Sequence, residues 1–299
     1  MLLVQGVAKV AVGGIPKVLT QWGVLILAAT PIGNLKDASP RLVEHLQSAQ
    51  FIAAEDTRTL LKLANALGIK LNAKLFSLHE HNEGDRVNQL AAIAAENDVL
   101  VVSDAGMPTV SDPGFQLVRG CVAAGVAVTI IPGPSAVLSA LAVSGLPTDR
   151  FSFEGFLPRK QGERTRLWQT LEHETRTMVF FESPHRILES LESALAVLGP
   201  DRQATVSREL TKKFEHTERG TLAQLVEWAK TEPKGEMVIV IAGAVATEHQ
   251  AIDVIDQVLE LVAAGSPLKP AVAQIAEAAG VSKSELYDLV LQKRKQALN

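Results

Sequence analysis

The feature that most restricts the fold is a regular alternation of short apolar runs with longer amphipathic ones, beginning at residue 23. Uninterrupted apolar runs of strand length occupy residues 23–30, 51–55, 74–78, 98–103 and 126–131. Helical patterns occupy 39–50, 57–68 and 85–97, and a further helix is expected from Pro113 with Asp112 as its N-cap. Because such strands joined by helices are typical of a mostly parallel sheet covered on both faces, we expect an α/β domain.

The alternation loosens near residues 146–166 and then resumes with a different character. Strand patterns at 177–182, 203–210 and 236–243 have connections that favour antiparallel pairing, whereas residues 251–299 are helical and contain the capping-box sequence SKSE. We therefore expect an α/β fold of two domains with mixed sheets and a small C-terminal helical domain. The expected boundaries are a poorly ordered extension at 1–22, α/β domains at 23–148 and 149–248, and a helical domain at 249–299.

Composition narrows the classes of function. The 299 residues are 47% hydrophobic, which is enough for two domains, and the net charge of −4 gives no overall polycation, although a local basic groove stays compatible. The single cysteine, Cys121, rules out an internal disulfide and a cysteine-cluster metal site and favours a reducing cytoplasm. No apolar run approaches the roughly 20 residues of a membrane span.

Three loops that combine proline and glycine follow predicted strands. They read TPIGN at 30–34, SDAGMPTVSDPG at 103–114 and PGPSA at 132–136. Glycine and proline let the backbone approach a ligand closely, and ligands of α/β sheets bind at the carboxyl ends of the strands. The chain has neither a G-x-G fingerprint nor a G-K-[ST] loop. We expect a neutral or cationic cofactor with carboxylate, amine and adenosine groups, and Asp104 binding a hydroxyl or amine.

Polar clusters follow other strands. One of these clusters consists of Glu55, Asp56 and Arg58, for which two interpretations are open. The three residues act on the substrate as acid/base or ribose-binding groups, or Asp56 caps the next helix while Arg58 pairs with a carboxylate. FESPHR at 181–186 and SRELTKKFE at 207–215 also place charges after apolar strands, where they need a partner or a ligand. In the first of these, Pro184 is expected to start a helix. His79 and His81 alternate without a third well-spaced ligand, so we expect no metal site.

Taken as a set, these stretches resemble the ribosomal-RNA-modifying branch of the tetrapyrrole methylase family, the class III S-adenosylmethionine methyltransferases. The resemblance covers about residues 23–299 and rests on ATPIGNLKDASPR, AAEDTR, SDAGMPTVSDPG, PGPSA, LPTDRFSFEGFLPRK, FFESPHR and RELTKKFE in this order. It implies S-adenosyl-L-methionine held between two α/β domains, a homodimer, and methylation of one cytidine ribose 2′-hydroxyl of 16S rRNA at the decoding centre. Tetrapyrrole-methylating relatives carry a G-G-D-P-type loop where this chain has DAGMP, and Met107 stands where we expect threonine.

The resemblance also implies roles for residues at matching positions. The cofactor-binding residues would be Pro31, Asp104, Ala105, Gly106, Met107, Ser135 and Ala136 from the first domain, and Phe181, Glu182, Glu209 and the rim near Gly243 from the second. A base within reach of the hydroxyl contributes roughly 10²–10⁴-fold. Glu55, Asp56, Glu182 and Glu209 are all available, and we favour Glu55, Asp56 and Arg58 as the catalytic cluster.

The RNA-binding residues would be Arg58, Arg159, Lys160, Arg186, Lys212 and Lys213. Because only 4% of the residues are aromatic, we expect base stacking to be minor beside phosphate contacts.

Two alternatives remain open. One is a methyltransferase of the same fold that acts on a tetrapyrrole or a protein. The other is a DNA-binding helix-turn-helix at 266–295, but only KRK at 293–295 is strongly basic there, and Glu285 and Asp288 lie where a recognition helix would face phosphate. That pattern favours an accessory module for RNA docking or dimer support.

Overall fold

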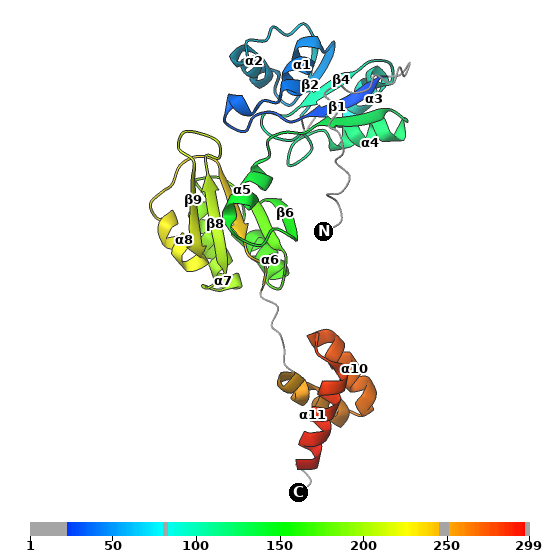
Figure 1. The fold of residues 1–299 in the computed structure, drawn as a ribbon, viewed down its shortest axis with the longest axis vertical. Coiled ribbons are helices and arrows are strands. Elements are labelled where there is room, and N and C mark those ends of the chain that lie inside the picture. The colour runs from blue at the N-terminus through cyan, green and yellow to red at the C-terminus, as the bar shows by residue number, and fades with distance from the viewer. Residues whose placement is uncertain (1–22, 80–82, 245–250, 297–299) are drawn as a thin grey trace, which may run out of the picture. The chain divides into compact units, whose positions relative to one another are not determined.

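The computed structural model describes residues 23–79, 83–244 and 251–296 (Figure 1). The described residues form two compact units, one that ends at Gly243 and one that follows it. The extension expected at 1–22 and His81 lie outside the described residues.

The first sheet is parallel throughout, as the alternating pattern predicts, with strand order β3-β2-β4-β1-β5. Its strands are β1 (Val24–Ala28), β2 (Phe51–Ala54), β3 (Lys74–Ser77), β4 (Val99–Val102) and β5 (Ala127–Ile131). The helices between them are α1 (Pro40–Ser48), α2 (Thr57–Ala66), α3 (Glu83–Glu96) and α4 (Phe115–Ala123). A short 3₁₀ turn, η1 (Leu35–Asp37), follows β1.

Alternate residues of each strand enter two different cores. Leu25 and Val101 pack with residues of α3 and α4 on one face, whereas Ile26 and Leu100 pack with residues of α1 and α2 on the other. Continuous apolar strands are therefore required, since both of their faces are buried.

The second sheet is mixed, also as expected, with strand order β6-β7-β10-β8-β9. β6 (Phe151–Phe156) pairs parallel with β7 (Thr177–Glu182), whereas β10 (Met237–Ile241), β8 (Gln203–Arg208) and β9 (His216–Thr221) add antiparallel ladders. Its helices are α6 (Gln161–Leu171), α7 (Ile187–Leu198) and α8 (Leu222–Ala229). β6 lies where the sequence pattern loosens, and it was not predicted.

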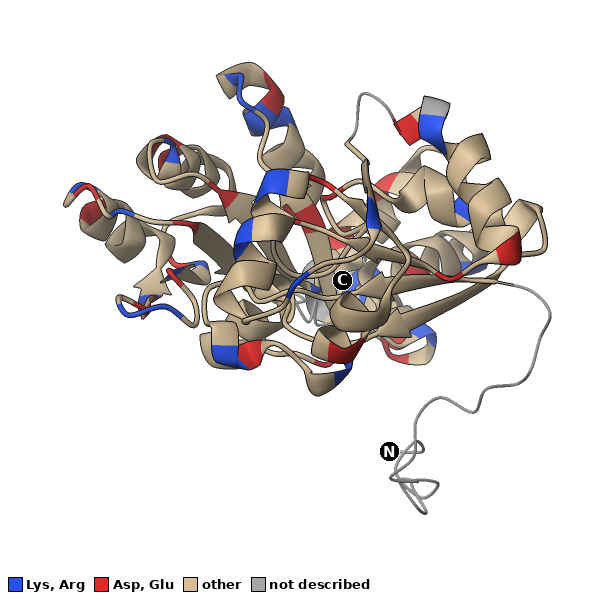
Figure 2. Cartoon of the chain, turned by 90° about the horizontal axis from the view of Figure 1, so that it is seen from above, with Lys and Arg blue, Asp and Glu red and all other residues tan. Residues whose placement is uncertain are grey.

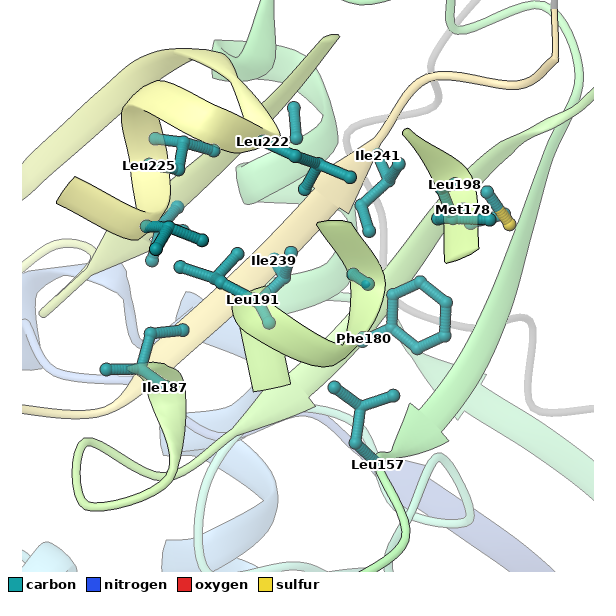
Figure 3. Close-up of a cluster of buried hydrophobic side chains, with 14 of the residues drawn as sticks. Leu157, Met178, Phe180, Ile187, Leu191, Leu198, Leu222, Leu225, Ile239 and Ile241 are labelled. Atoms are coloured by element: carbon teal, nitrogen blue, oxygen red, sulfur yellow. The ribbon is translucent and has the colours of Figure 1, made fainter. Parts of the chain in front are cut away.

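The two faces of the second sheet are covered by helices from different parts of the chain. Figure 3 shows Phe180 and Ile239 in one buried cluster with Leu191 of α7 and Leu222 of α8, and Trp168 of α6 belongs to the same core. The opposite face is covered by α5 (Ala136–Ser144), whose Ala140 is fully buried in a cluster with strand residues of this sheet. The helix that follows the last strand of the first sheet thus packs on the second.

The C-terminal unit has a core of its own. It consists of the 3₁₀ turn η2 (Ala251–Val254) and helices α9 (Ile255–Ala263), α10 (Leu268–Ala279) and α11 (Lys283–Gln296) around residues such as Val258 and Leu286. Gly280 ends α10 in the left-handed conformation, with φ of 68°, and the Ser282 hydroxyl accepts a hydrogen bond from the Glu285 N–H at 3.4 Å. The predicted outline of two helices joined by a short turn is confirmed.

Two predicted helix starts are wrong. Asp112 and Pro113 do not begin α4, which starts at Phe115 after Gly114. The free N–H groups there are satisfied from a distant part of the chain, because Glu83 Oε1 accepts hydrogen bonds from the N–H groups of Gly114, Gln116 and Leu117 at 2.7–3.1 Å. Likewise Pro184 opens a turn, and α7 begins at Ile187.

Candidate functional site

A cavity of about 400 Å³ lies where the carboxyl-end loops of the first sheet meet the second sheet. From the first sheet it is lined by Ile32, Glu55, Asp104, Ala105, Gly106, Met107, Val110, Ser111 and Asp112, and by Ser135, Ala136 and Val137 at the start of α5. From the second sheet it is lined by Phe156, Phe181, Glu182, Ser183, Pro184, Leu210, Glu236, Met237 and Val238. All three loops singled out in the sequence reach this cavity, as expected for ligand sites of α/β sheets.

Backbone contacts fix the loops of the first sheet against each other. Thr30 and Gly106 exchange two backbone hydrogen bonds, at 2.8 and 3.1 Å, which tie the loop after β1 to the loop after β4. Gly106 has φ of 80°, and a Cβ there would lie 3.4 Å from Ile32 Cγ2. Only glycine fits this turn without strain.

The loop after β4 also holds residues in uncommon backbone conformations. Thr109 has φ of 75° and Ser111 has φ of 62°, both in the left-handed region although neither is glycine. Such residues cost about 1–3 kcal/mol each and cluster at functional sites. The surrounding contacts, including the Glu83 cap of α4, hold this loop in a costly shape beside the cavity.

Three carboxyl groups of the first sheet face the cavity. Glu55 Oε2 accepts a hydrogen bond from the Asp104 N–H at 3.1 Å, and Asp104 Oδ1 accepts one from the Asp56 N–H at 3.1 Å. Desolvation raises the pKa of Glu55 and of Asp104. Desolvation, with repulsion from Glu55 as the next cause, raises the pKa of Asp112 to about 7. The site thus concentrates negative charge without a basic partner for these three groups in the cavity lining.

Asp56 and Arg58 do not join this group. Asp56 caps α2 by accepting the Arg58 N–H at 2.8 Å, and its carboxylate pairs with the Arg58 guanidinium at 2.7 Å. These hydrogen bonds lower the pKa of Asp56 to about 2. Of the two interpretations weighed for this cluster, the helix cap with an ion pair is the one that the geometry supports, while Glu55 alone faces the cavity.

On the second sheet, Glu182 is a buried anchor. Its carboxylate accepts hydrogen bonds from Arg186 Nε and Nη2 at 2.8 and 2.5 Å and from the Ser190 hydroxyl at 2.6 Å. Arg186 also donates to the Leu157 carbonyl at 3.0 Å. These contacts engage Nε and Nη2, whereas the buried Nη1 has no hydrogen-bond partner among the described residues, and the expectation that Arg186 contacts RNA phosphate stays a prediction.

A second ion-pair network engages Lys212 and Glu209. Lys212 Nζ lies 3.0 Å from Glu209 Oε1 and 2.8 Å from Glu236 Oε2, so Lys212 too is neutralised within the protein. Glu209 does not line the cavity, whereas its neighbours Leu210 and Glu236 do. Gly33, in the loop after β1, lets the Lys212 stem approach, since a Cβ at Gly33 would lie 2.4 Å from Lys212 Cγ.

The remaining predicted residues have simpler positions. Pro31 is outside the cavity lining, where Ile32 takes its place. Arg159, Lys160 and Lys213 are exposed. Gly243 follows β10 at the end opposite the cavity, because β10 enters the lining with Met237 and Val238.

Sequence reasoning missed several lining residues. Asp112 was assigned to a helix cap because Asp-Pro is a common helix start, and the distant Glu83 that fills this role left no local signal. Phe156 lies in a strand that was not predicted, and Met237 and Val238 begin a strand of which only the rim near Gly243, at the other end, was expected to approach the cofactor.

Two kinds of feature are absent from the part of the chain that the structure describes. Among residues 23–79, 83–244 and 251–296, no group of three or more His, Cys, Asp or Glu side chains could hold a metal ion. Over the same ranges, no helix combines the length and apolar character needed to cross a membrane.

Comparison with known proteins agrees with this geometry. Residues 24–226 match the model of the Tetrapyrrole (Corrin/Porphyrin) Methylases, and residues 248–294 match that of the RsmI C-terminal HTH domain. Solved structures share the fold, among them a diphthine synthase (17% identity, 73% of this chain and 89% of that chain, TM-score 0.55) and the methyltransferase CobJ (21% identity, 74% and 94%, TM-score 0.53). At these identities the likeness concerns the fold alone.

Curated relatives are much more similar in sequence. The ribosomal RNA small subunit methyltransferase I of Mycobacterium tuberculosis strain CDC 1551 is 49% identical, over 92% of this chain and 96% of the relative. The protein of the same name from Escherichia coli O157:H7 is 44% identical, over 91% and 96%. The chain therefore belongs to the ribosomal RNA small subunit methyltransferase I family, within the tetrapyrrole methylases.

Proposed function

We propose that this enzyme transfers the methyl group of S-adenosyl-L-methionine to the ribose 2′-hydroxyl of a cytidine in 16S rRNA, at the decoding centre of the small ribosomal subunit. Methylation of small-subunit rRNA follows from membership of the family. The nucleoside, the 2′-oxygen and the position in the RNA are the proposal. The observation that supports the proposal is a cavity lined by carboxyl groups between the two sheets. It occurs in a chain whose curated relatives are named rRNA methyltransferases.

The cavity suits S-adenosyl-L-methionine in size and in chemistry. Its volume of about 400 Å³ lies in the range of about 300–1,000 Å³ common for small-molecule sites. Glu55, Asp104 and Asp112 can hold a ligand that carries a sulfonium and an ammonium group, and apolar residues such as Val137 and Val238 can cover its adenosine. When bound, this cofactor supplies an electrophilic methyl group on a positively charged sulfur.

The general base is proposed among the carboxyl groups that face the cavity. The ribose hydroxyl must lose its proton as the new oxygen–carbon bond forms, and a carboxylate with a pKa near neutrality accepts it most effectively. Asp112, with its pKa raised to about 7, fits this role better than Asp56, whose pKa is lowered to about 2. Desolvation is the main reason why the pKa of Asp112 is high, and repulsion from Glu55 raises it further.

The RNA contacts are proposed for cations that remain exposed. These are Arg58, which pairs with its neighbour Asp56, Lys160, which pairs with Glu163 one helical turn away at 3.1 Å, and Arg159 and Lys213. Basic and acidic residues are interspersed over the described chain (Figure 2), so binding depends on local groups of cations rather than on overall charge.

We also propose a homodimer that acts in the cytoplasm, where ribosomal subunits are assembled. Large apolar side chains are exposed on α4 and β5 of the first sheet, with Val122 at 62% and Ile130 at 43% exposure. A second copy could cover them. Sedimentation of wild type and of Val122→Asp tests this, because an unchanged monomer in both would contradict it.

The proposed function is tested by mapping ribose methylation. Small subunits from cells that lack the enzyme are incubated with the purified protein and S-adenosyl-L-methionine, and 2′-O-methylation is mapped along 16S rRNA. A single new modified cytidine at the decoding centre is expected. Methyl transfer to a base, to a ribosomal protein or to a tetrapyrrole offered in a parallel reaction would refute the proposal.

A further inference from the structure

A bulge in β6 turns one aromatic side chain toward the cavity. The pairing advances by two residues along β7, from Val179 to Phe181, but by three along β6, from Phe153 to Phe156. Because side chains alternate between the faces of a sheet, the extra residue returns Phe156 to the face of Phe153. Gly155, with φ of 73°, occupies the bulge.

The Phe156 ring is supported from behind and open in front. It meets the Phe181 ring edge to face, with centroids 5.4 Å apart and an angle of 63°, and Phe153 contacts the same ring at 4.9 Å. Although it lines the cavity, Phe156 is 61% exposed. An aromatic face is therefore fixed in place and available at the edge of the site.

The segment after Phe156 is held by two guanidinium groups. Arg186 donates to the Leu157 carbonyl at 3.0 Å, and Arg164, which is 2% exposed, donates to the carbonyls of Pro158 and Arg159 at 3.3 Å. Arg164 is itself fixed by the Ser193 hydroxyl at 3.0 Å. The carbonyls of Leu157, Pro158 and Arg159 are thus held in place. The exposed side chains of Arg159 and Lys160 extend from this segment, and Lys160 Nζ pairs with Glu163 at its surface, at 3.1 Å.

We propose that Phe156 is the surface on which the base of the target nucleotide stacks, and that Arg159 and Lys160 bind the phosphates next to it. This inference rests on the proposed function. The carboxylate wall suits a cationic cofactor, whereas an aromatic face followed by two cations suits a nucleotide in a single strand. Stacking at this one residue then matters in spite of the low aromatic content of the chain.

The test compares Phe156→Ala, Phe156→Leu and Phe156→Trp with wild type. The control is Phe151→Ala, which removes an exposed ring, 37% exposed, at the other end of the same strand and outside the cavity lining. For each protein, the KM for unmodified small subunits and the Kd for S-adenosyl-L-methionine are measured.

We expect Phe156→Ala to raise the KM for subunits roughly 10-fold, as alanine substitution of stacking residues does, with an unchanged Kd for the cofactor. Phe156→Trp should restore the KM, Phe156→Leu should not, and Phe151→Ala should behave as wild type. The inference would be overturned by an unchanged KM in Phe156→Ala or by a KM that Phe156→Leu restores fully. It would also be overturned if Phe156→Ala raised the Kd for the cofactor and left the KM normal. A wild-type enzyme inactive on these subunits would instead overturn the proposed function, and this inference with it.

Discussion

At the scale of single residues, two aspartates that follow different strands of the first sheet lie in opposite electrostatic environments. Arg58 donates hydrogen bonds to Asp56 and lowers its pKa to about 2, whereas burial beside Glu55 raises the pKa of Asp112 to about 7. Environments that separate the pKa values of neighbouring carboxyl groups assign them different roles. Asp56 stays ionised and structural, while Asp112 can exchange a proton near neutral pH.

The first prediction concerns the pH dependence of methyl transfer. If Asp112 must be ionised to accept the hydroxyl proton, kcat/KM should fall as the pH decreases through about 7. Asp112→Asn should remove this dependence and lower the rate roughly 10²-fold or more. Rates on small subunits between pH 5.5 and 9 provide the measurement, with Asp56→Asn as the control that keeps the pH profile. A profile that persists in Asp112→Asn would assign the base to another group.

The second prediction concerns stability and follows from the same raised pKa. Between the ordinary pKa of aspartate, 3.8, and about 7, folded Asp112 holds a proton that the unfolded chain has released. The contribution of Asp112 to stability therefore decreases as the pH rises through this window and is unfavourable above it. Asp112→Asn, which stays neutral, should raise the melting temperature at pH 8 and change it little at pH 4. An equal shift at both values would show that ionisation is not the cause.

At the scale of elements, the beginning of α4 depends on a residue far away in the chain. Glu83 accepts three backbone N–H groups there with a single carboxylate oxygen, and its side chain is 6% exposed. This contact ends the strained loop that contains Thr109 and Ser111. The cap of a helix and the shape of a loop that lines the cavity are therefore set by the same side chain.

The third prediction follows from this cap. Glu83→Ala should destabilise the protein by about 2 kcal/mol, because buried N–H groups lose their acceptor, and should weaken cofactor binding by loosening the loop. Glu83→Gln keeps a carbonyl oxygen at the same place and should therefore lose less stability and less cofactor affinity. Melting temperature and the cofactor Kd are the measurements, with Glu96→Ala on the same helix as an exposed control. A Glu83→Ala protein with unaltered Kd would separate the cap from the site.

Elements that are defined by local patterns were predictable, and those defined by distant contacts were not. The five strands of the first sheet follow from continuous apolar runs, because both faces of that sheet are buried. β6 was missed since its bulge at Gly155 breaks the alternation that marks a strand. Asp112 was misassigned because an Asp-Pro pair signals a helix start locally, while the true acceptor, Glu83, is brought there only by folding.

The same distinction applies to the candidate site. The loops that line the cavity could be predicted from their glycines and prolines, as Asp104 and Gly106 illustrate. The partners of charged residues could not be predicted. Arg186 and Lys212 were expected to contact RNA, and in the folded chain both are engaged in ion pairs. Charge is visible in a sequence, but its neutralisation is a property of the folded chain.

At the scale of the whole molecule, the described chain divides into two compact units, and the helices α9, α10 and α11 belong to the second one. This unit has a core of its own, and the residues that line the cavity all precede Gly243 in the chain. The basic residues Lys293, Arg294 and Lys295 lie in the last turn of α11. We propose that this helical unit supports binding to the small ribosomal subunit and does not affect the proposed cofactor site.

The fourth prediction tests this separation. A chain ending at Gly243 should bind S-adenosyl-L-methionine with the Kd of the full chain, because every lining residue is retained. Its KM for small subunits should rise, since a proposed docking module is missing. Calorimetric titration and subunit methylation are the measurements, and circular dichroism of residues 251–299 alone should show helix. Loss of cofactor binding in the shortened chain would mean that the two units cooperate in the site.

The position of α5 limits where this enzyme can be cut into working fragments. The loosened pattern near residue 148 invites division after α5, yet that cut would separate Ala140 and Leu141 from the strands of the second sheet that cover them. A split enzyme should instead reassemble best from pieces divided before α5, within residues 132–135, although this loop also reaches the cofactor cavity. The division that disturbs the packing least therefore lies in a loop of the proposed cofactor site. Because the cofactor would contact residues on both sides of this division, a reporter built on fragment reassembly should respond to the cofactor.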